Sequence, residues 1–363
     1  MTTQTHAGGT TQRRAALVGT GLIGGSVGLA LRSLGWHVTG TDEDATVLAR
    51  AVEVGAVDAT GVDPDAELTV VATPVSTVAQ LARQALERGG VVTDVGSVKA
   101  PVVADVAHPR FVGGHPMAGS EALGIDGARA DLFSGATWAI TPDDHTDPAA
   151  LSLVHGAVRS MGAEVVTLDP LQHDRLVATV SHVPHLTAAA LMGVAERRSA
   201  EHPALKRLAA GGFRDMTRIA AGDPRIWIDI CNDNSEAICE VLDGLVESLS
   251  ELRSIVEQGD SGELLERLEV AQVARRNLPA GAPDPEHLVE VRVEVTDRPG
   301  ELASITTLAT EADINVYDIE VVHAAGAAAA TLILVVAERD AGALSSALEL
   351  SGRRPGVQPL GEA

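Results

Sequence analysis

One short segment constrains the fold of this chain more than any other. Residues 18–26 read VGTGLIGGS, in which Gly19, Gly21 and Gly24 form the pattern G-x-G-x-x-G between a strand-like run and an apolar, helix-like run. Glycines at this spacing allow a tight turn and let backbone N–H groups approach a pyrophosphate, which the N-terminus of the following helix also attracts. The segment therefore predicts a parallel α/β domain that binds a dinucleotide.

An acidic residue completes this pattern. Asp42 ends the second strand-like run, 21 residues beyond Gly21, where a carboxylate accepts a hydrogen bond from a ribose 2′-hydroxyl and repels a 2′-phosphate, so we expect NAD rather than NADP. Thr73 and Pro74 follow the third run, where the cleft of such a domain passes over the cofactor. A loop without a ligand, an ordinary strand-end acid and a plain turn are the simpler interpretations. The predicted cofactor residues are Gly19, Gly21, Leu22, Ile23, Gly24, Asp42, Thr73 and Pro74.

Apolar patterning divides the chain into several parts. Short apolar runs alternate with helical segments through residues 13–167, which is typical of a doubly wound Rossmann domain. Residues 168–279 carry helical periodicity without strand signals, and their broad apolar faces favour a subunit interface. The polar residues 1–12 are expected to be a disordered tail, and the proline-rich residues 280–287 a linker. Residues 288–360 have the order βαββαβ, which predicts a small ferredoxin-like α+β domain.

Composition excludes several classes of protein. The 363 residues carry a net charge of −23, which argues against a partner nucleic acid because phosphate contacts need clustered Lys and Arg. The N-terminal segment lacks the apolar core of a signal peptide, and the longest apolar run, residues 324–337, is too short to span a bilayer. Cys231 and Cys239 match no metal or redox spacing. We therefore expect a cytoplasmic protein that makes no contact with a membrane.

The polar residues that could carry out chemistry follow two predicted strands. Residues 93–99 read TDVGSVK and include Ser97, and residues 113–121 read GGHPMAGSE and include His115. Both segments leave the carboxyl ends of strands, which is the ligand-binding side of a parallel sheet, so we expect them to meet beside the cofactor. From its sequence context alone, His115 could be a proton acceptor, a metal ligand or a turn residue.

The helical region contributes a second polar cluster. The segment SHVPH places His182 and His185 three positions apart, on one face of a helix, and Pro184 predicts a kink or a helix start because it lacks a backbone donor. Zinc would need a further ligand, and no clear sequence partner is present, so we expect no metal. Arg218 is flanked by small and apolar residues in a strongly acidic chain and is suited to bind a carboxylate.

Together, five segments resemble those of the prephenate/arogenate dehydrogenase family of tyrosine biosynthesis. They are VGTGLIGGS, DVGSVK, GGHPMAGSE, SHVPH and GGFRDMTRIA…DPRIW, which occur in this order across nearly the whole chain. The resemblance implies a Rossmann domain followed by an all-α dimerisation domain, and hence a homodimer. It also implies oxidative decarboxylation of prephenate to 4-hydroxyphenylpyruvate, or of arogenate to tyrosine, with NAD or NADP as the hydride acceptor.

The same resemblance implies roles for individual residues. His115 matches the catalytic histidine, which would accept the proton of the ring C4 hydroxyl. Ser97 matches the serine that orients this histidine, and Arg218 the arginine that holds a substrate carboxylate. The other substrate-pocket residues implied in this way are His182, His185, Ser181, Ser120, Glu121 and Trp227.

The C-terminal part resembles an ACT domain. Its first predicted strand is followed by the segment DRPGEL, and the backbone of a Pro-Gly turn at a helix N-terminus is a credible site for a carboxylate. The resemblance implies feedback control by a tyrosine effector, with a role in assembly alone as the alternative. The regulatory residues implied are Asp297, Pro299, Gly300 and Asn315.

Three other functions remain open from the sequence. Arogenate dehydrogenase uses the same chemistry, and Glu121 could favour the ammonium group of arogenate as His185 could favour the keto group of prephenate. Hydroxyacid and imine reductases also combine a Rossmann domain with helices, but neither Lys99 nor Lys206 has the context of a catalytic lysine. A non-enzymatic sensor of NAD and an amino acid is the third.

Overall fold

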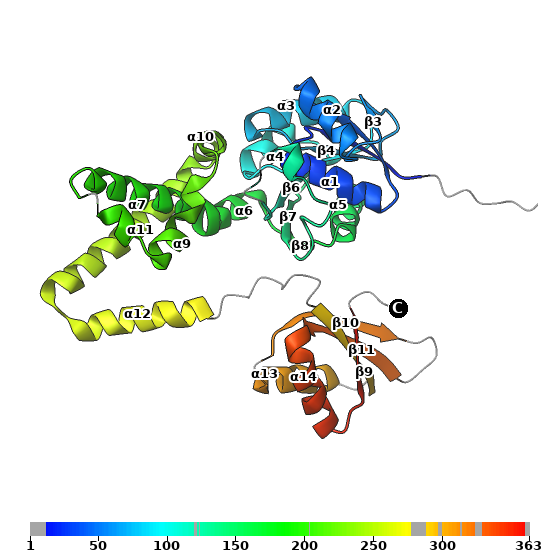
Figure 1. The fold of residues 1–363 in the computed structure, drawn as a ribbon. Coiled ribbons are helices and arrows are strands. Elements are labelled where there is room, and N and C mark those ends of the chain that lie inside the picture. Colours follow the sequence, from blue (N-terminus) through cyan, green and yellow to red (C-terminus); the bar gives the residue numbers. More distant parts are fainter. Residues whose placement is uncertain are drawn as a thin grey trace, which may run out of the picture. The chain divides into compact units, whose positions relative to one another are not determined.

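The computed structural model describes residues 12–359, except positions 120, 121, 123, 203, 277–287, 297–299, 313 and 324–328. The chain forms two compact units, Met1–Arg276 and Asn277–Ala363 (Figure 1). The α/β region and the helical region, which the sequence divides after residue 167, therefore belong to one unit. The predicted tail, apart from Gln12, and the predicted linker lie outside the described residues.

An eight-stranded sheet organises the first unit, with the strand order β3-β2-β1-β4-β5-β6-β7-β8 (Figure 1). Strands β1 to β6 are parallel to one another. The chain leaves β3 at one edge and begins β4 on the other side of β1, and such a reversal creates the crevice in which α/β proteins bind ligands. The strands are β1 Arg14–Val18, β2 His37–Thr41, β3 Ala59–Thr60, β4 Leu68–Val71, β5 Val91–Asp94, β6 Phe111–Pro116, β7 Thr137–Thr141 and β8 Glu164–Thr167.

Helices cover both faces of this sheet, as the alternation of strands and helices predicts. Val70 and Val71 are neighbours in β4 and so point to opposite faces. Val70 packs in one buried cluster with Val154 of α5, and Val71 packs in another with Val78 of α3. The helices of this region are α1 Leu22–Ser33, α2 Ala45–Glu53, α3 Val75–Leu86, α4 Ala100–Val106 and α5 Pro148–Ser160.

One strand pair departs from the predicted parallel arrangement. Strand β7 runs antiparallel to β6, with His115 opposite Ala139. A parallel return requires a crossover connection, usually a helix, whereas the described residues between these strands form only the short 3₁₀ turn η1, Ile125–Gly127. His115 was expected to follow a strand, but it lies within β6. Its backbone is therefore held by the sheet.

The helical region begins with a long run that contains a π turn just before Pro184, where a kink or a helix start was predicted. Helix α6 passes through η2 directly into α7, where Pro184 occupies the second position. One buried cluster joins the helical region to the α/β region. It contains Val183 and Ile230 from the helices and Val98 from the segment after β5. The elements are α6 Pro170–Val177, η2 Ala178–His182, α7 Val183–Ser199, α8 Leu205–Leu208, α9 Gly211–Thr217, η3 Arg218–Ala221, α10 Pro224–Asp233, α11 Ser235–Gln258 and α12 Ser261–Arg276.

By length and composition alone, the run Pro170–Ser199 could cross a membrane. Core helices of globular proteins pass the same test, and the side chains of this run decide how it is used here. His173, Asp174 and His182 are buried and hydrogen-bonded within the protein. We therefore interpret the run as a helix of the protein core.

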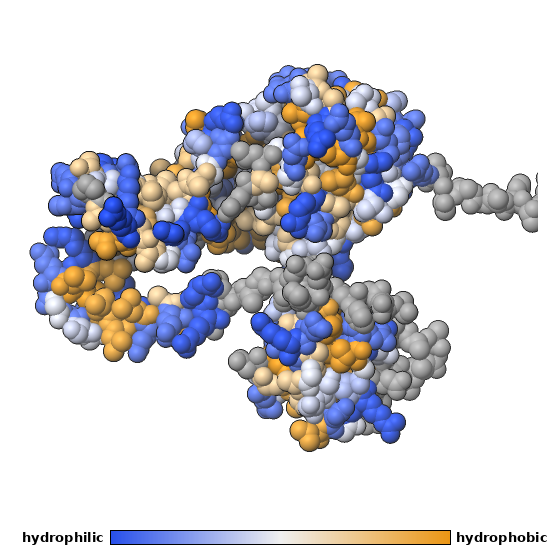
Figure 2. Space-filling view, viewed as in Figure 1, coloured by the Kyte–Doolittle hydropathy of each residue, from blue (hydrophilic) through white to orange (hydrophobic). Residues whose placement is uncertain are grey.

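The last two helices of the region leave apolar side chains exposed. Figure 2 shows apolar surface gathered where α11 leads into α12. Helix α12 has no buried residue, and an exposed patch of this kind marks an interaction surface. This agrees with the subunit interface expected from the sequence. The exposed residues are Val246, Leu249, Val256, Leu265, Leu268, Val270 and Val273.

The second unit has the predicted order βαββαβ. Its four strands form an antiparallel sheet in the order β10-β11-β9-β12, packed on a core that includes Val291, Ile305 and Leu344. The elements are β9 Leu288–Thr296, α13 Glu301–Glu311, β10 Val316–His323, β11 Ala329–Ala337, α14 Glu338–Leu350 and β12 Pro355–Pro359.

Two of the four predicted regulatory residues are described. Gly300 caps the N-terminus of α13 with φ of +92°, a conformation that favours glycine. Asn315 is exposed and directly precedes β10. Asp297 and Pro299 lie outside the described residues, so the effector site remains a prediction.

Candidate active site

The glycine-rich turn joins β1 to α1 in the predicted manner. Gly19 has φ of +90°, and a Cβ atom there would lie 2.4 Å from the carbonyl oxygen of Ala72. A Cβ atom on Gly24 would lie 2.1 Å from the carbonyl oxygen of Gly19. Gly21 is the N-cap of α1, which has no side-chain cap, so the first N–H groups of Leu22 and its neighbours can bind an anion.

The other predicted cofactor residues gather around this turn. Oδ2 of Asp42, just after β2, accepts hydrogen bonds from the backbone N–H (2.7 Å) and the hydroxyl (3.0 Å) of Thr20. Its Oδ1 accepts from the N–H of Asp44 at 3.0 Å. Thr73 follows β4, and its Cγ2 would lie 3.0 Å from a Cβ on Gly19. The carboxylate and the turn are therefore held together at the reversal point of the sheet.

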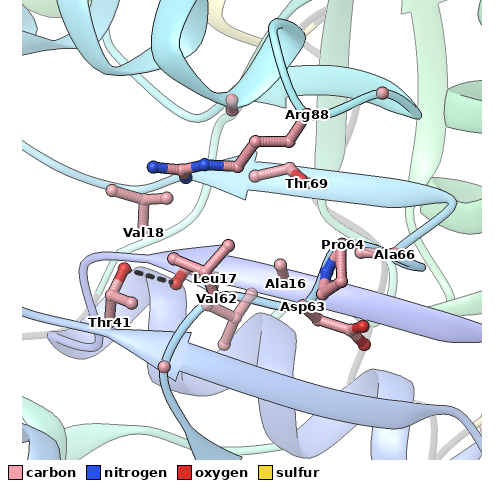
Figure 3. A pocket seen from close by; sticks show the side chains of 13 residues that line it. Ala16, Leu17, Val18, Thr41, Val62, Asp63, Pro64, Ala66, Thr69 and Arg88 are labelled. Carbon is pink, nitrogen blue, oxygen red and sulfur yellow. Dashed lines mark hydrogen bonds between the residues drawn. The ribbon is translucent and has the colours of Figure 1, made fainter.

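A small cavity in the α/β region cannot hold a cofactor. A cavity of about 20 Å³ lies between β1, the segment after β3 and the end of α3 (Figure 3). Val18, Thr41, Val62 and Arg88 are among the residues that line it. A space of this size holds about one water molecule, so we assign it no ligand.

A chain of three buried side chains begins at His115. The Nδ1 atom of His115 lies 2.9 Å from Nε2 of His173, and Nδ1 of His173 lies 2.8 Å from Oδ1 of Asp174. A carboxylate only accepts hydrogen bonds, so the proton of a neutral His173 is on Nδ1 and its Nε2 accepts from the Nδ1–H of His115. This leaves Nε2 of His115 without a proton and able to act as a base.

Two backbone N–H groups hold the end of this chain in place. Oδ1 of Asp174 accepts from the N–H of Lys99, and Oδ2 accepts from the N–H of Ala100, both at 2.8 Å. Both carboxylate oxygens of Asp174 thus accept hydrogen bonds from backbone donors, and this holds the carboxylate in the position that fixes the direction of both histidine hydrogen bonds.

The pKa of His115 is lowered well below the usual value for histidine. Burial is the largest cause, and electrostatic interactions with His173, Lys99 and His182 lower the pKa further. Both effects disfavour the imidazolium form. The side chain, which is 8% exposed, therefore stays neutral at neutral pH.

Among the hydrogen bonds of the described residues, none joins Ser97 to His115, so the orienting role of Ser97 stays a prediction. Ser97 is half-buried after β5, and among the hydrogen bonds of the described residues the partner of His115 is His173. The sequence interpretation missed His173 and Asp174, although both lie in the apolar run that leads to SHVPH. A His-Asp pair in an apolar helix was the signal that could have revealed them, because such residues are rarely buried unless paired.

A buried ion pair clamps the peptide next to His115. Lys99 and Asp94 form a salt bridge and are both fully buried. Asp94 Oδ1 accepts from the N–H of Gly114 at 3.1 Å, and Nζ of Lys99 donates to the carbonyl of Gly114 at 2.9 Å. A Cβ on Gly114 would lie 2.6 Å from the carbonyl oxygen of Asp94, so only glycine fits there.

Aromatic and imidazole rings from the helical region form a second part of the site. The ring of His185 stacks on Trp227 at 3.6 Å with an angle of 12°, and His182 meets the same indole edge-on at 6.1 Å. Burial lowers the pKa of His185, and the pKa of His182 falls to about 4, chiefly because of burial. Both rings are therefore neutral at neutral pH. Ser181 is half-buried in the π turn beside them.

The remaining predicted residues are only partly placed. Arg218 is exposed at the start of η3, which packs against α7. Gly222 at the end of η3 lies beside His185, since a Cβ there would be 3.8 Å from the imidazole Cε1. Ser120 and Glu121 lie outside the described residues. Within the described part of the chain, no group of three His, Cys, Asp or Glu side chains could hold a metal ion.

Comparison with known proteins identifies the family. The prephenate dehydrogenase nucleotide-binding domain matches residues 27–167, and the dimerization domain of that family matches residues 169–270. Prephenate dehydrogenase from Bacillus subtilis (strain 168) is 34% identical over 327 residues, which are 85% of this chain and 87% of that protein. The chain belongs to the prephenate dehydrogenase family.

Solved structures of similar proteins extend this result. A prephenate dehydrogenase from A. aeolicus, crystallised with hydroxyphenyl propionate and NAD+, is 31% identical with a TM-score of 0.70, over 74% of this chain and 99% of that one. An arogenate dehydrogenase from Synechocystis is 30% identical with a TM-score of 0.64, over 72% and 99% of the two chains. This member of the prephenate dehydrogenase family is thus an NAD-dependent oxidoreductase.

We expect Gly19→Ala and Gly21→Ala to separate folding from cofactor binding. The first substitution creates backbone strain and a clash with Ala72, so it should lower the free energy of unfolding by roughly 1–3 kcal/mol. A methyl group on Gly21 would meet nothing within 4 Å in the described part of the chain and should leave stability unchanged. Both should weaken NADH binding because each alters the turn that receives the pyrophosphate.

Thermal unfolding and fluorescence titration with NADH would test this pair. Tryptophan emission reports on the first unit, since Trp36, Trp138 and Trp227 all lie there. A Gly19→Ala variant as stable as the parent chain would contradict the expected backbone strain and the clash at position 19. A Gly21→Ala variant with the parent affinity for NADH would contradict the assignment of the turn.

We expect Lys99→Met to destabilise the first unit strongly. Removing one member of a buried ion pair leaves the other charge uncompensated, which costs roughly 3–5 kcal/mol. Lys206→Met is the matched control, because Lys206 pairs with Glu196 at the surface, where such pairs contribute about 0–1 kcal/mol. Urea unfolding followed by tryptophan emission measures both variants. Equal unfolding midpoints would contradict the stabilising role of the Lys99–Asp94 ion pair.

Proposed function

We propose that this chain catalyses the NAD-dependent oxidative decarboxylation of prephenate to 4-hydroxyphenylpyruvate. The observation that carries the proposal is the buried, neutral His115, whose Nδ1–H is directed to His173 and whose Nε2 is left as a base. The glycine-rich turn and the ring pair of His185 and Trp227 belong to the same unit. Proton removal, dinucleotide binding and ring binding are the three requirements of this reaction.

The geometry of the turn fits NAD. Neither Gly19 nor Gly24 has room for a Cβ atom, so the turn packs closely. Its backbone N–H groups lead to the uncapped N-terminus of α1, where a pyrophosphate would be held. Asp42 keeps a carboxylate beside that turn, where it would accept a hydrogen bond from a ribose 2′-hydroxyl. Thr73 and Pro74 would pass beneath the dinucleotide.

The chemistry divides between cofactor and protein. When bound, NAD+ would supply the hydride acceptor for C4 of the substrate ring. His115 Nε2 takes the proton of the C4 hydroxyl at the same time, so that a neutral carbonyl forms there. The positive charge on His115 is then opposed by Asp174 through His173, with no proton needing to leave the imidazole chain.

Loss of CO₂ follows without a further base. The electrons of the breaking C–C bond enter the ring, which becomes aromatic, and the C4 oxygen becomes a phenolate. His115 then returns its proton to that oxygen, which restores the neutral imidazole. The protein must therefore hold the substrate dianion without neutralising the carboxylate that leaves.

Substrate binding would fall to the helical region. Arg218 would hold a substrate carboxylate. Because the chain has a net charge of −23, an anionic substrate needs such a local positive charge. His182, His185 and Trp227 would line the ring and side-chain pocket together with Ser181, while Ser120, Glu121 and Ser97 would border the nicotinamide end. The exposed faces of α11 and α12 would associate in a homodimer. We place the enzyme in the cytoplasm.

We expect His115→Asn to lower kcat/KM for prephenate by about 10²–10⁴-fold, the range for loss of a general base. NADH affinity should be unchanged because the glycine-rich turn is intact. His145→Asn, on an exposed loop, is the control. The rate of NADH formation measures both variants. Near-parent turnover by His115→Asn would remove His115 as the base, and no NADH formation by the parent chain would reject the proposed substrate.

The same assay has a defined pH dependence. The pKa of His115 is depressed, so the active neutral form persists as pH falls and is lost only below the ordinary histidine value of about 6.5. The acid limb of kcat/KM, which reports the free enzyme, should therefore lie below pH 6.5 and vanish in His115→Asn.

Arogenate is the second candidate substrate. Its support is the likeness to the Synechocystis arogenate dehydrogenase and to a cyclohexadienyl dehydrogenase from Zymomonas mobilis, which is 32% identical over 72% of this chain and 94% of its own length. The ratio of kcat/KM for prephenate and arogenate decides between them.

We further propose that the second unit is an ACT domain that binds tyrosine. Its βαββαβ order and the Gly300 turn at the start of α13 support this assignment. Asp297, Pro299 and Asn315 would complete the site, and bound tyrosine would inhibit the enzyme.

We expect equilibrium dialysis with tyrosine to show binding by the full chain and none by a chain that ends at Arg276. That boundary separates the two compact units, so the shorter chain should keep NADH binding. Binding by neither chain, or equal binding by both, would contradict a regulatory site in the second unit.

A further inference from the structure

A buried asparagine joins the base to the substrate pocket. Asn234 is 6% exposed and lies between α10 and α11, with φ of −120° and ψ of 29°. Its Nδ2 lies 2.8 Å from the backbone carbonyl oxygen of Asp174 and 3.2 Å from Nδ1 of His182. Among the hydrogen bonds of the described residues, no other side chain binds both of these groups.

The partners of Asn234 determine which way its amide points. A carbonyl oxygen accepts hydrogen bonds and cannot donate, so the group that faces Asp174 must be the amide nitrogen and not the amide oxygen. That nitrogen carries two hydrogens. One is used by the carbonyl of Asp174, and the other is directed to Nδ1 of His182.

The second hydrogen bond determines the tautomer of His182. Because Nδ1 receives a hydrogen, it carries none of its own, and the proton of the neutral ring is on Nε2. Its ring is 1% exposed, and Nε2 has no hydrogen-bond partner in the described part of the chain. A buried N–H without a partner is costly, so such a group in a native structure calls for an explanation, such as a bound water molecule or a catalytic role.

The surroundings of His182 indicate where this N–H is used. The ring meets the edge of Trp227 and lies close enough to His115 to lower the pKa of that base. The positions of His182 and of the His115–His173–Asp174 chain are thus coupled through one amide, which contacts Asp174 on one side and His182 on the other.

We infer that Asn234 is a positioning residue that holds His182 as a neutral donor, with its Nε2–H directed at an oxygen of the substrate. Carbonyl and carboxylate oxygens can only accept hydrogen bonds, so they are the substrate oxygens best suited to complete this donor. The inference rests on the proposed function for the identity of the substrate, but the tautomer of His182 does not depend on it.

Nitrogen NMR of the full-length, ¹⁵N-histidine-labelled protein tests the tautomer without substrate. We expect His182, assigned by its loss in His182→Gln, to carry its proton on Nε2 and to keep it through pH 5, since its pKa is about 4. A proton on Nδ1 would overturn the inference. The Nε2–H signal should move when prephenate and NADH, a pair that cannot react, are added. An unchanged signal would overturn the assignment of the substrate oxygen as its acceptor.

Asn234→Asp tests the positioning role. A carboxylate can only accept, so Nδ1 of His182 must gain a proton, and the ring changes tautomer or becomes charged with a raised pKa. We expect kcat/KM for prephenate to fall about ten- to hundredfold, the scale of one lost hydrogen bond to a charged group, with NADH affinity unchanged. Asn232→Asp, on the exposed side of the same segment, should change neither quantity.

Asn234→Ala provides a second variant that adds no buried charge. It should release the tautomer of His182 and lower kcat/KM in the same direction. A loss of activity with the His182 tautomer unchanged in both variants would show a merely structural role and overturn the inference. A parent chain that forms no NADH from prephenate would instead reject the proposed function, whatever the tautomer.

Discussion

The carboxylate of Asp174 receives hydrogen bonds from two regions that are distant in the sequence. The backbone N–H groups of Lys99 and Ala100 come from the segment after β5, and the ring of His173 comes from the adjacent position of α6. Because the carboxylate can only accept, every proton in the chain toward His115 is directed the same way. One contact therefore docks the helical region on the sheet and also sets which nitrogen of His115 is basic.

Burial, more than charge, governs the chemistry of this site. The chain is strongly acidic, and an acidic protein favours protonation of its histidines in general. At His115, His182 and His185 the largest effect is nonetheless burial, which lowers each pKa. Neutral rings act through the direction of their hydrogen bonds. The site consequently depends on neighbours that fix tautomers, such as Asp174 and Asn234, as much as on the rings themselves.

The sequence predicted the parts of the structure that rest on local rules. The turn at Gly19, the order βαββαβ and the start of α7 at Pro184 follow from glycine spacing, hydrophobic periodicity and a missing backbone donor, respectively. The antiparallel β7, the partner of His115 and the role of Asn234 depend on contacts between segments far apart in the chain. His173 and His182 are also nine residues apart, about two and a half turns of a regular helix, so a helical period places them on opposite faces and hides their proximity.

The π turn Ala178–His182 reconciles that spacing with a common site. A π turn holds one residue more than an α turn, so it behaves as a one-residue insertion that a continuous helix has absorbed. Removing a single residue from it would restore an unbroken α-helix, and everything beyond, including His185, would turn by about 100° relative to His173. The geometry of the pocket thus depends on the length of this helix as well as on its side chains. A one-residue deletion in the π turn would move His185 away from His173 and His115, although all three histidines would still be present.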